Sequence, residues 1–462
     1  MTILEQARIG RDASWGREAI DTLRLAWPIA LTQLGQVAMM TSDLAMIGRL
    51  GDQVVAAASL AHAILFAVFV LGMGVVSAVA TLAAQGYGAR NPRYVRRASC
   101  AGIWAGITFG VPLSIGMLWG KELLVALGQE SGAASIAEQY LIGLTWCLVP
   151  AWVFIALRGF MGAVNRPEPA LWITLVAIPA NSALAYALIF GAAGLPRLEM
   201  LGAGIATTIV NILMCAAALW FVQTRRPFRK YHIAGGLWRF DVPLTLELLR
   251  VGLPISGAFL LEVGLFSAAA LMMGRFGVTA LAAHQIALQT AAIMFMVPFG
   301  ISMAATVRVG HAVGRRDGEG ARRAGFTAIH LAVGFMAGMT VLVLFSRQAI
   351  PAAFLGEAAA GATETVRLVG LFLVCGSMFF IFDGIQTVAA GALRGLSDTR
   401  IPLFLAALGF WGVGFVGSYL LAFVKEVGPV GIWLGLTLGL VSFASMLVAR
   451  FHYLTHRGRI PG

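Results

Sequence analysis

Long apolar stretches separated by short polar segments recur along the whole chain, and this pattern restricts the fold more than any other feature. The stretch from Leu253 to Gly277 is typical, because it is long enough to cross a membrane as a helix. It also carries one carboxylate, Glu262, near its middle. Hydrophobic residues make up 59% of the chain and charged residues 12%, which no ordinary soluble domain has. The sequence therefore predicts an all-α, polytopic membrane protein.

Twelve stretches reach about the 20 residues that a membrane-spanning helix requires. They lie at 22–47, 54–85, 97–120, 133–157, 169–191, 200–223, 247–274, 279–312, 322–346, 362–391, 402–423 and 429–453. Arginine and lysine are concentrated in alternate connections, at 8–24, 90–97, 158–166, 225–230, 315–323, 394–400 and 450–459. Because basic loops stay on the cytoplasmic side, we expect a multi-pass protein of a bacterial inner membrane with both termini in the cytoplasm.

The two halves of the chain are copies of each other. Residues 24–98 align with residues 250–324 without a gap, and 20 of the 75 positions are identical. The identical positions include glycine, proline and arginine residues, such as Pro28 with Pro254. Shared apolar composition does not readily keep such residues in register, so we interpret the pattern as an internal duplication.

The longest polar connection lies between the copies. We expect an N-terminal six-helix lobe at 1–223, a cytoplasmic linker at 224–246 and a C-terminal six-helix lobe at 247–462. Six spans in each half make the repeats parallel. The prediction is therefore twelve transmembrane helices in two pseudo-symmetric bundles around a central cleft.

Three acidic residues lie well inside the apolar stretches, namely Asp43, Glu262 and Asp383. An acid inside a membrane costs free energy and usually belongs to an ion or proton pathway. No basic residue lies within one helical turn of any of the three, although a distant helix could supply one. The duplication aligns Glu262 with Gln36 and Asp43 with Ala269, so the two halves carry different acids.

The surroundings of these acids leave two coupling ions open. Asp43 and Glu262 have apolar neighbours at helical spacing, which favours a neutral, protonated carboxyl group and a role as proton carrier. Asp383 is followed by Gln386 and Thr387, whose oxygen atoms suit a hard cation. The alternative to H+ is therefore Na+, bound at Glu262 and Asp383.

Polar, aromatic and methionine side chains on the spans expected at the cleft form a candidate substrate surface. Aromatic faces attract cations, and methionine adapts to varied shapes. Packing between helices or contact with lipid is the alternative for each of them. The candidates are Gln36, Asn181, Phe266, Gln289, Met294, Phe295 and Phe299.

Other functional classes find little support in the sequence. It has no Walker A, HExxH or GxSxG motif, so we expect neither an enzyme nor a cofactor, and an ion gradient would supply the energy. The formal net charge of +12 comes from short loops and not from a basic domain, which disfavours nucleic acid as a partner. The expected partners are small cationic molecules and the lipid bilayer, and we expect a monomer.

The sequence resembles the multidrug and toxic compound extrusion (MATE) family, most closely its NorM-like branch. The matching stretches include WPIALTQLGQVAMMTSDLAMIGRLGDQVVAAASLA at 27–61, LRVGLPISGAFLLEVGLF at 249–266 and FDGIQTVAAGALRGLSDTRIPL at 382–403. The resemblance implies a twelve-helix antiporter that exports cationic, amphipathic drugs in exchange for H+ or Na+. It implies that Asp43 is the coupling acid of the first lobe and that Glu262 and Asp383 form the site of the second.

One position departs from the pattern of some relatives. Phe379, one turn before Asp383, stands where they have a hydroxyl group, which favours H+ over Na+. A flippase for lipid-linked precursors, with a similar helix bundle, is the alternative function. Such a flippase needs basic residues for a pyrophosphate, whereas the three charges placed inside the spans are acidic.

Overall fold

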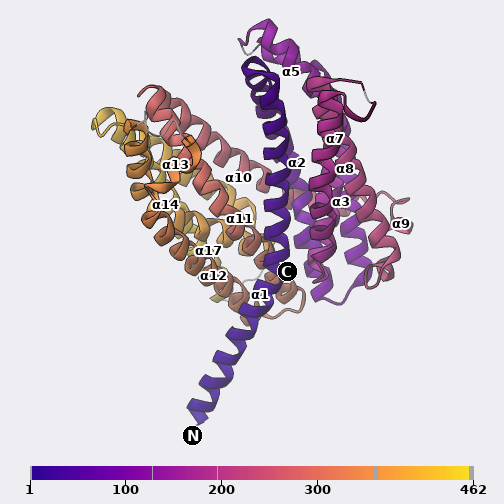
Figure 1. Cartoon of the computed structure of the whole chain (residues 1–462). Helices are drawn as coiled ribbons and strands as arrows, with labels where there is room; N and C mark the ends of the chain where they lie inside the picture. The colour runs from indigo at the N-terminus through magenta and orange to yellow at the C-terminus, as the bar shows by residue number, and fades with distance from the viewer. Residues whose placement is uncertain (1–2, 127, 195, 357–362, 457–462) are drawn as a thin grey trace. The chain divides into compact units, whose positions relative to one another are not determined.

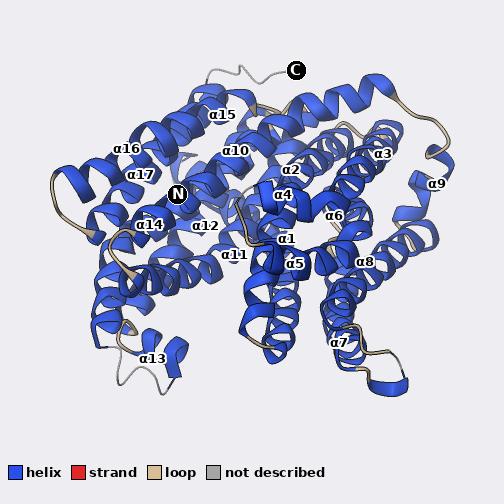
Figure 2. Cartoon of the chain, turned by 90° about the horizontal axis from the view of Figure 1, so that it is seen from above, coloured by secondary structure: helices blue, strands red, loops and turns tan. Residues whose placement is uncertain are grey.

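The computed structural model describes residues 3–126, 128–194, 196–356 and 363–456, apart from the side chains of residues 3–14, 52 and 193. These residues form helices joined by short connections, with no strand among them (Figures 1 and 2). Within them, ten helices are long and apolar enough to cross a membrane. The bent helix α14 (Thr363–Gly395) gives an eleventh, with an angle of 50° between Thr363–Cys375 and Ser377–Gly395. The predicted all-helical membrane fold is confirmed.

The elements follow the apolar stretches of the sequence closely. The first half contains α1 (Ile3–Ile47), α2 (Asp52–Gly88), α3 (Pro92–Gly116), α4 (Gly120–Ala126), α5 (Ser131–Leu144), α6 (Leu148–Ala163), α7 (Glu168–Phe190), α8 (Glu199–Thr224) and α9 (Ile233–Gly236). The second half contains α10 (Val242–Gly274), α11 (Val278–Gly314), α12 (Gly318–Phe345), α13 (Ala349–Leu355), α14, α15 (Arg400–Ala406), α16 (Val416–Tyr419) and α17 (Pro429–His456). Residues Arg400–Val424 are helical without a break. The last expected basic loop, 450–459, runs past the described residues at position 457.

The expected first span, 22–47, forms the later part of α1. It is not among the eleven candidate spans, because Gln33, Gln36 and Asp43 lower its apolar character. The number of twelve spans therefore stays a prediction, while helical structure is present in all twelve expected stretches.

The duplication is visible in the backbone. Arg90 and Arg316, which are 226 positions apart, both have a positive φ, 53° and 58°. The residues that follow them, Asn91 and Asp317, cap α3 and α12 by accepting a hydrogen bond from the backbone N–H three positions on. The two halves therefore share details of helix capping that the count of identical residues does not show.

The contacts divide the chain into two compact units, each described here by itself. One unit is residues 31–256, and the other is residues 1–30 together with 257–462. We call them the 31–256 unit and the 257–462 unit. Both divisions fall inside a helix, after Ala30 in α1 and after Ser256 in α10, and 256 minus 30 is again 226. The lobe boundaries expected at the linker remain a prediction.

A close approach between two helices occurs at equivalent places in the two units. A Cβ atom added to Gly74 of α2 would lie 2.4 Å from the backbone nitrogen of Ser256. One added to Gly300 of α11 would lie 2.7 Å from Cβ of Ala30. Gly74 and Gly300 are 226 positions apart, as are Ala30 and Ser256. Glycine lets helix backbones approach closely in membranes, and here the duplication has kept both members of the contact.

Polar contacts attach the first part of α1 and of α10 to the unit to which each belongs. In the 257–462 unit, Arg308 donates to both carboxylate oxygens of Glu18, each at 2.8 Å. In the 31–256 unit, Arg97 donates to Asp241, and the hydroxyl of Tyr94 donates to Glu247 at 3.0 Å. The two repeats therefore use different residues for the same structural purpose.

Candidate functional site

Asp43 lies in the later part of α1, and its side chain is bound by two neighbouring helices. Asn181 of α7 donates to Oδ1 at 2.5 Å, and the hydroxyl of Thr207 in α8 donates to Oδ2 at 3.0 Å. Asp43 is only 5% exposed, and no described cationic side chain pairs with it. A buried carboxylate is thus satisfied here by neutral donors alone.

Further contacts hold these three helices together around Asp43. Ser42 and Ser182 share a hydrogen bond of 2.9 Å between α1 and α7. The hydroxyl of Thr207 also lies 3.1 Å from the carbonyl oxygen of Ala203, so its single proton can serve either acceptor. The other amide atom of Asn181, Oδ1, is buried and has no hydrogen-bond partner among the described residues. The site therefore holds an unused acceptor and a hydroxyl that can turn away from the acid.

Glu262 of α10 and Asp383 of α14 meet at a shared amide in the 257–462 unit. Nε2 of Gln386 lies 3.1 Å from Oε1 of Glu262 and 3.1 Å from Oδ1 of Asp383. It also lies 3.0 Å from Oγ1 of Thr387. Asp383 is 5% exposed, like Asp43. The structure thus brings together two acids that are 121 positions apart in the sequence.

A buried arginine follows Asp383 on the same face of α14. Positions 383, 387, 390 and 394 follow the helical repeat, so Arg394 lies about three turns beyond Asp383. Its Nη2 donates to Oγ of Ser302 at 3.0 Å, and its guanidinium lies 5.7 Å from the ring centre of Phe259. The pattern of basic residues predicts a loop position for Arg394, which is wrong. The spacing from Asp383 was the signal that could have placed it inside the helix.

A second arginine that the basic-residue pattern places in a loop, Arg158, is also buried inside a helix, α6. In the structure its Nη1 donates to Oε1 of Gln33 and, at 3.3 Å, to Oε1 of Gln36. Gln36 aligns with Glu262 in the duplication. An arginine therefore binds an amide at this position in one unit, whereas an amide binds an acid at the equivalent position in the other.

The substrate-cleft candidates are divided between the two units. Gln36 and Asn181 belong to the 31–256 unit, where each takes part in the hydrogen bonds described above. In the 257–462 unit, Phe266 packs edge-to-face on Phe379, with ring centres 6.1 Å apart. The remaining candidates all lie on α11, where Met294 and Phe299 are buried, Phe295 lies against Phe299 and Gln289 is exposed. Their role in substrate binding stays a prediction.

Comparison with known proteins decides the family. The family model MatE matches residues 28–187 and again residues 254–420. The chain belongs to the MATE family. The two matches begin 226 positions apart, as the duplication predicts, and they cover Asp43, Glu262 and Asp383. The family comprises transporters and not enzymes. The expected MATE membership and the expectation that the chain is not an enzyme are therefore confirmed.

Several bacterial relatives of this MATE chain are similar along almost its whole length. A probable multidrug resistance protein NorM from Rhodopseudomonas palustris is 61% identical over 445 residues, which cover 96% of this chain and 94% of the relative. A protein of the same description from Bradyrhizobium diazoefficiens is 50% identical over 440 residues, covering 95% and 94%. The resemblance to the NorM-like branch is thereby confirmed.

Solved MATE structures share the fold at low sequence identity. The crystal structure of the eukaryotic MATE transporter AtDTX14 gives a TM-score of 0.83 at 21% identity, covering 96% of this chain and 99% of that one. A crystal structure of MATE in complex with MaL6 gives a TM-score of 0.86 at 17% identity, covering 96% and 97%. The multi-pass MATE fold is therefore established independently of the sequence match.

Proposed function

We propose that this chain exports cationic, amphipathic compounds in exchange for protons. The bacterial relatives described as multidrug resistance proteins support export of drugs. The observation that carries the choice of H+ is the set of partners of the three intramembrane acids. Asp43, Glu262 and Asp383 all accept hydrogen bonds from amides or hydroxyls, with no ion pair to any described arginine or lysine.

Neutral partners matter because a coupling acid must be able to lose its charge. A carboxylate paired with a buried arginine leaves an uncompensated cation when it takes up a proton, which costs several kcal/mol. An acid held by an amide and a hydroxyl leaves only hydrogen bonds to rearrange. Asp43 is therefore suited to cycle between an ionised and a neutral form. Glu262 and Asp383 are likewise held by an amide, although the buried charge of Arg394 also acts on Glu262.

The surroundings of Asp43 offer a place for the added proton. When Asp43 is protonated, the amide of Asn181 can turn over and accept the new O–H with Oδ1, which is otherwise without a partner among the described residues. The Thr207 hydroxyl can then donate to the carbonyl of Ala203 at 3.1 Å. Both protonation states of Asp43 are thus satisfied by the same two side chains.

Glu262 and Asp383 are also held by a neutral group, because both accept a hydrogen bond from the amide of Gln386. Two neighbouring carboxylates carry one negative charge more easily than two, so the pair is suited to hold a single exchangeable proton. The Nε2 group of Gln386 points at both acids and at Thr387, where a bound Na+ would need oxygen atoms. This arrangement supports H+ over Na+.

A cationic substrate can exchange with the proton because both favour the same acids. Protonation removes the negative charge that attracts the cation, so uptake of a proton favours release of the drug. Aromatic side chains such as Phe266 and Phe295 supply apolar, cation-attracting surface in the unit that holds Glu262. A flippase for lipid-linked precursors needs basic residues to bind a pyrophosphate. The buried Arg158 and Arg394 are basic, so the acidic charges inside the spans no longer exclude it so strongly. Both nevertheless already bind side chains of their own unit.

Transport by the purified protein in liposomes tests this proposal. We expect an imposed pH gradient to drive movement of ethidium, a fluorescent cation, and an imposed Na+ gradient alone to drive none. Movement driven by Na+ at constant pH would replace H+ by Na+ as the coupling ion. Failure of both gradients, together with transport of a lipid-linked pyrophosphate, would support the flippase.

A further inference from the structure

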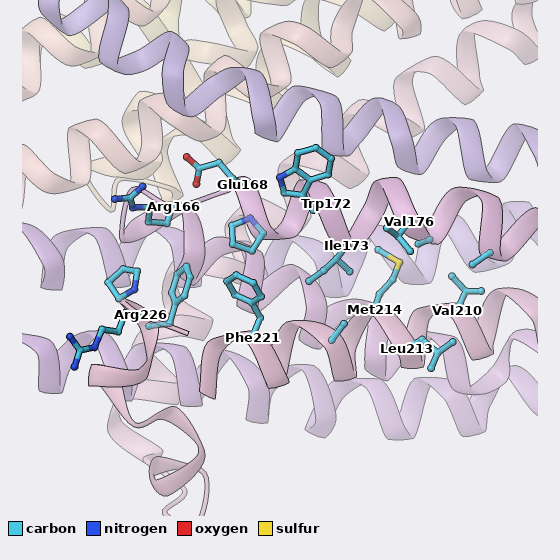
Figure 3. A pocket seen from close by; sticks show the side chains of 16 residues that line it. Arg166, Glu168, Trp172, Ile173, Val176, Val210, Leu213, Met214, Phe221 and Arg226 are labelled. Atoms are coloured by element: carbon cyan, nitrogen blue, oxygen red, sulfur yellow. The ribbon is translucent and has the colours of Figure 1, made fainter. Parts of the chain in front are cut away.

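A groove of about 900 Å³ runs along the 31–256 unit between α7 and α8 (Figure 3). Two arginines, Arg166 and Arg226, lie at one end of it, and the labelled apolar side chains extend away from that end. These apolar side chains include Trp172, Ile173, Val176, Leu213 and Met214. We call the end of the groove at Arg166 and Arg226 its cationic mouth, and the rest of the groove, lined by these apolar side chains, its apolar channel.

The groove lies on the opposite face of α7 from Asp43. Thr174 and Ile178 of α7 lie against Gly35 of α1, and Asn181 of the same face binds Asp43. Trp172 comes two positions before Thr174, and Val176 comes two positions before Ile178. Two positions are more than half a turn around an α-helix, so these groove residues point away from Gly35. The groove is therefore separate from the acid site of this unit.

The apolar walls of the groove are exposed. Trp172 is 66% exposed, Val176 67% and Leu213 58%. They belong to Glu168–Phe190 and Glu199–Thr224, two helices that are long and apolar enough to span the membrane. Exposed apolar surface on such helices is solvated by the hydrocarbon chains of lipid.

The mouth of the groove carries excess positive charge. Neither Arg166 nor Arg226 forms an ion pair among the described residues, and Glu168 is the one acid among the lining residues. The adjacent Arg225 is engaged differently, since its guanidinium lies 5.9 Å from the ring centre of Trp220. Two unpaired guanidinium groups at a membrane interface attract a phosphate.

The segment that carries Arg226 is held in place by aromatic packing. Phe228 is buried, and its ring centre lies 5.8 Å from that of Phe160 in α6 and 5.9 Å from that of Phe221 in α8. Both Phe221 and Phe228 line the groove. The packing of Phe228 therefore holds the backbone next to Arg226 beside the apolar part of the groove.

The length of the groove matches one leaflet of a bilayer. It runs along α7 from Glu168 to Ala180, which is about 18 Å at 1.5 Å per residue. Half of the ~30 Å hydrocarbon core is roughly 15 Å. A lipid chain that begins at the arginines can thus lie along the groove to about the middle of the membrane.

The second half of the chain carries different residues at the equivalent place. The stretch GAVNRPEPA at 162–170 aligns with GLSDTRIPL at 395–403, so Thr399 replaces Arg166 and Asp398 replaces Asn165. Asp398 accepts a hydrogen bond of 2.9 Å from Arg450 of α17. Arg166 therefore has no arginine at the aligned position of the second half, where Arg400 takes the place of Pro167.

We propose that this groove binds one anionic phospholipid, with its phosphate at Arg166 and Arg226 and one acyl chain along Trp172, Val176 and Leu213. Both arginines belong to loops that the basic-residue pattern assigns to the cytoplasmic side, so the lipid belongs to the cytoplasmic leaflet. The inference does not depend on the coupling ion or on the transported compound.

Native mass spectrometry of the full-length protein tests the inference. The protein is offered phosphatidylglycerol or phosphatidylcholine with identical acyl chains. We expect wild type to retain one phosphatidylglycerol in preference to phosphatidylcholine by about tenfold. The double variant Arg166→Gln with Arg226→Gln should lose that preference. The matched control, Arg225→Gln, removes a neighbouring arginine that stacks on Trp220 and should retain it.

A second variant tests the apolar channel without changing the cationic mouth. Ala180→Phe places a large side chain at the far end of the groove and leaves both arginines in place, so we expect weaker retention of the long-chain lipid. A short-chain phosphatidylglycerol should then bind as well as it does to wild type. Equal retention of both headgroups by wild type, or an unchanged preference in the double variant, would overturn the proposal. Displacement of the lipid by ethidium would identify the groove as a drug site instead.

Discussion

Asn181 donates a hydrogen bond of 2.5 Å to Asp43, while its remaining amide oxygen is buried without a partner among the described residues. The amide therefore satisfies the ionised acid and keeps an acceptor unused. In a proton-coupled transporter this arrangement lets one side chain serve both protonation states.

Replacement of Asn181 by alanine should change the pH dependence of transport. Asn181 can bond to both forms of Asp43, but its bond to the ionised acid is charge-assisted and therefore the stronger one. Its loss weakens the ionised form more, so the neutral form persists to higher pH. We expect the pH profile of ethidium transport in liposomes to shift toward alkaline values and the rate at pH 7 to fall about tenfold. Ser182→Ala, which removes the nearby contact with Ser42, is the control and should leave the profile in place. A slower rate with an unshifted profile would reduce Asn181 to a packing role.

Glu262 and Asp383, the two acids of the 257–462 unit, should each be essential for coupling. Glu262→Gln or Asp383→Asn removes the exchangeable charge and leaves a side chain of nearly the same shape. We expect either variant to lose ion-driven ethidium efflux by at least tenfold while the protein still inserts into the membrane. Glu364→Gln, whose carboxylate forms an exposed pair with Arg367, should transport normally. Full efflux in both variants would contradict the assignment.

The contact between Glu18 and Arg308 should dominate the attachment of the first part of α1. Glu18→Gln leaves a half-buried guanidinium without its principal partner, which typically costs about 3 kcal/mol of unfolding free energy. Asp21 also contacts Arg308, at 3.2 Å, but it is exposed, so Asp21→Asn should cost less than about 1 kcal/mol. Thermal unfolding of the detergent-solubilised protein compares the two. Equal effects would show that burial does not set the difference.

The duplicated glycine contacts should tolerate no side chain. Gly74→Val and Gly300→Val place atoms within 3 Å of backbone or Cβ atoms of the facing helix, so each should destabilise its unit by about 1–3 kcal/mol. Gly338→Ala on α12, where an added Cβ meets nothing within 4 Å, is the control. Thermal unfolding again measures the effect. Wild-type stability of both valine variants would mean that these helices separate readily at this point.

The sequence predicted the acids and the repeat but not their partners. Asp43, Glu262 and Asp383 stand out because a charge in an apolar stretch is rare. Their contacts depend on which faces of distant helices meet, and one apolar face resembles another in sequence. The sequence places Gln386 near Asp383 on one helix, but nothing near position 386 indicates that Glu262 lies beside it.

The two buried arginines show a different reason for failure. Counting basic residues per loop assigns a side to each connection, but it does not say where a helix ends. Arg158 and Arg394 lie within the last two turns of α6 and α14, close enough to the loops to be counted with them. Their burial depends on Gln33, Gln36 and Ser302, which come from other helices.

The division of the chain after Ala30 and Ser256 has a consequence for biosynthesis. The 31–256 unit is continuous, so the ribosome has synthesised all of it before the other unit can begin to form. Glu18 is made before this unit, whereas its partner Arg308 is made after it. At 5–20 residues per second, the 226 intervening residues take about 10 to 45 s to make. The first segment of the nascent chain therefore stays without its final neighbours until most of the protein has been translated.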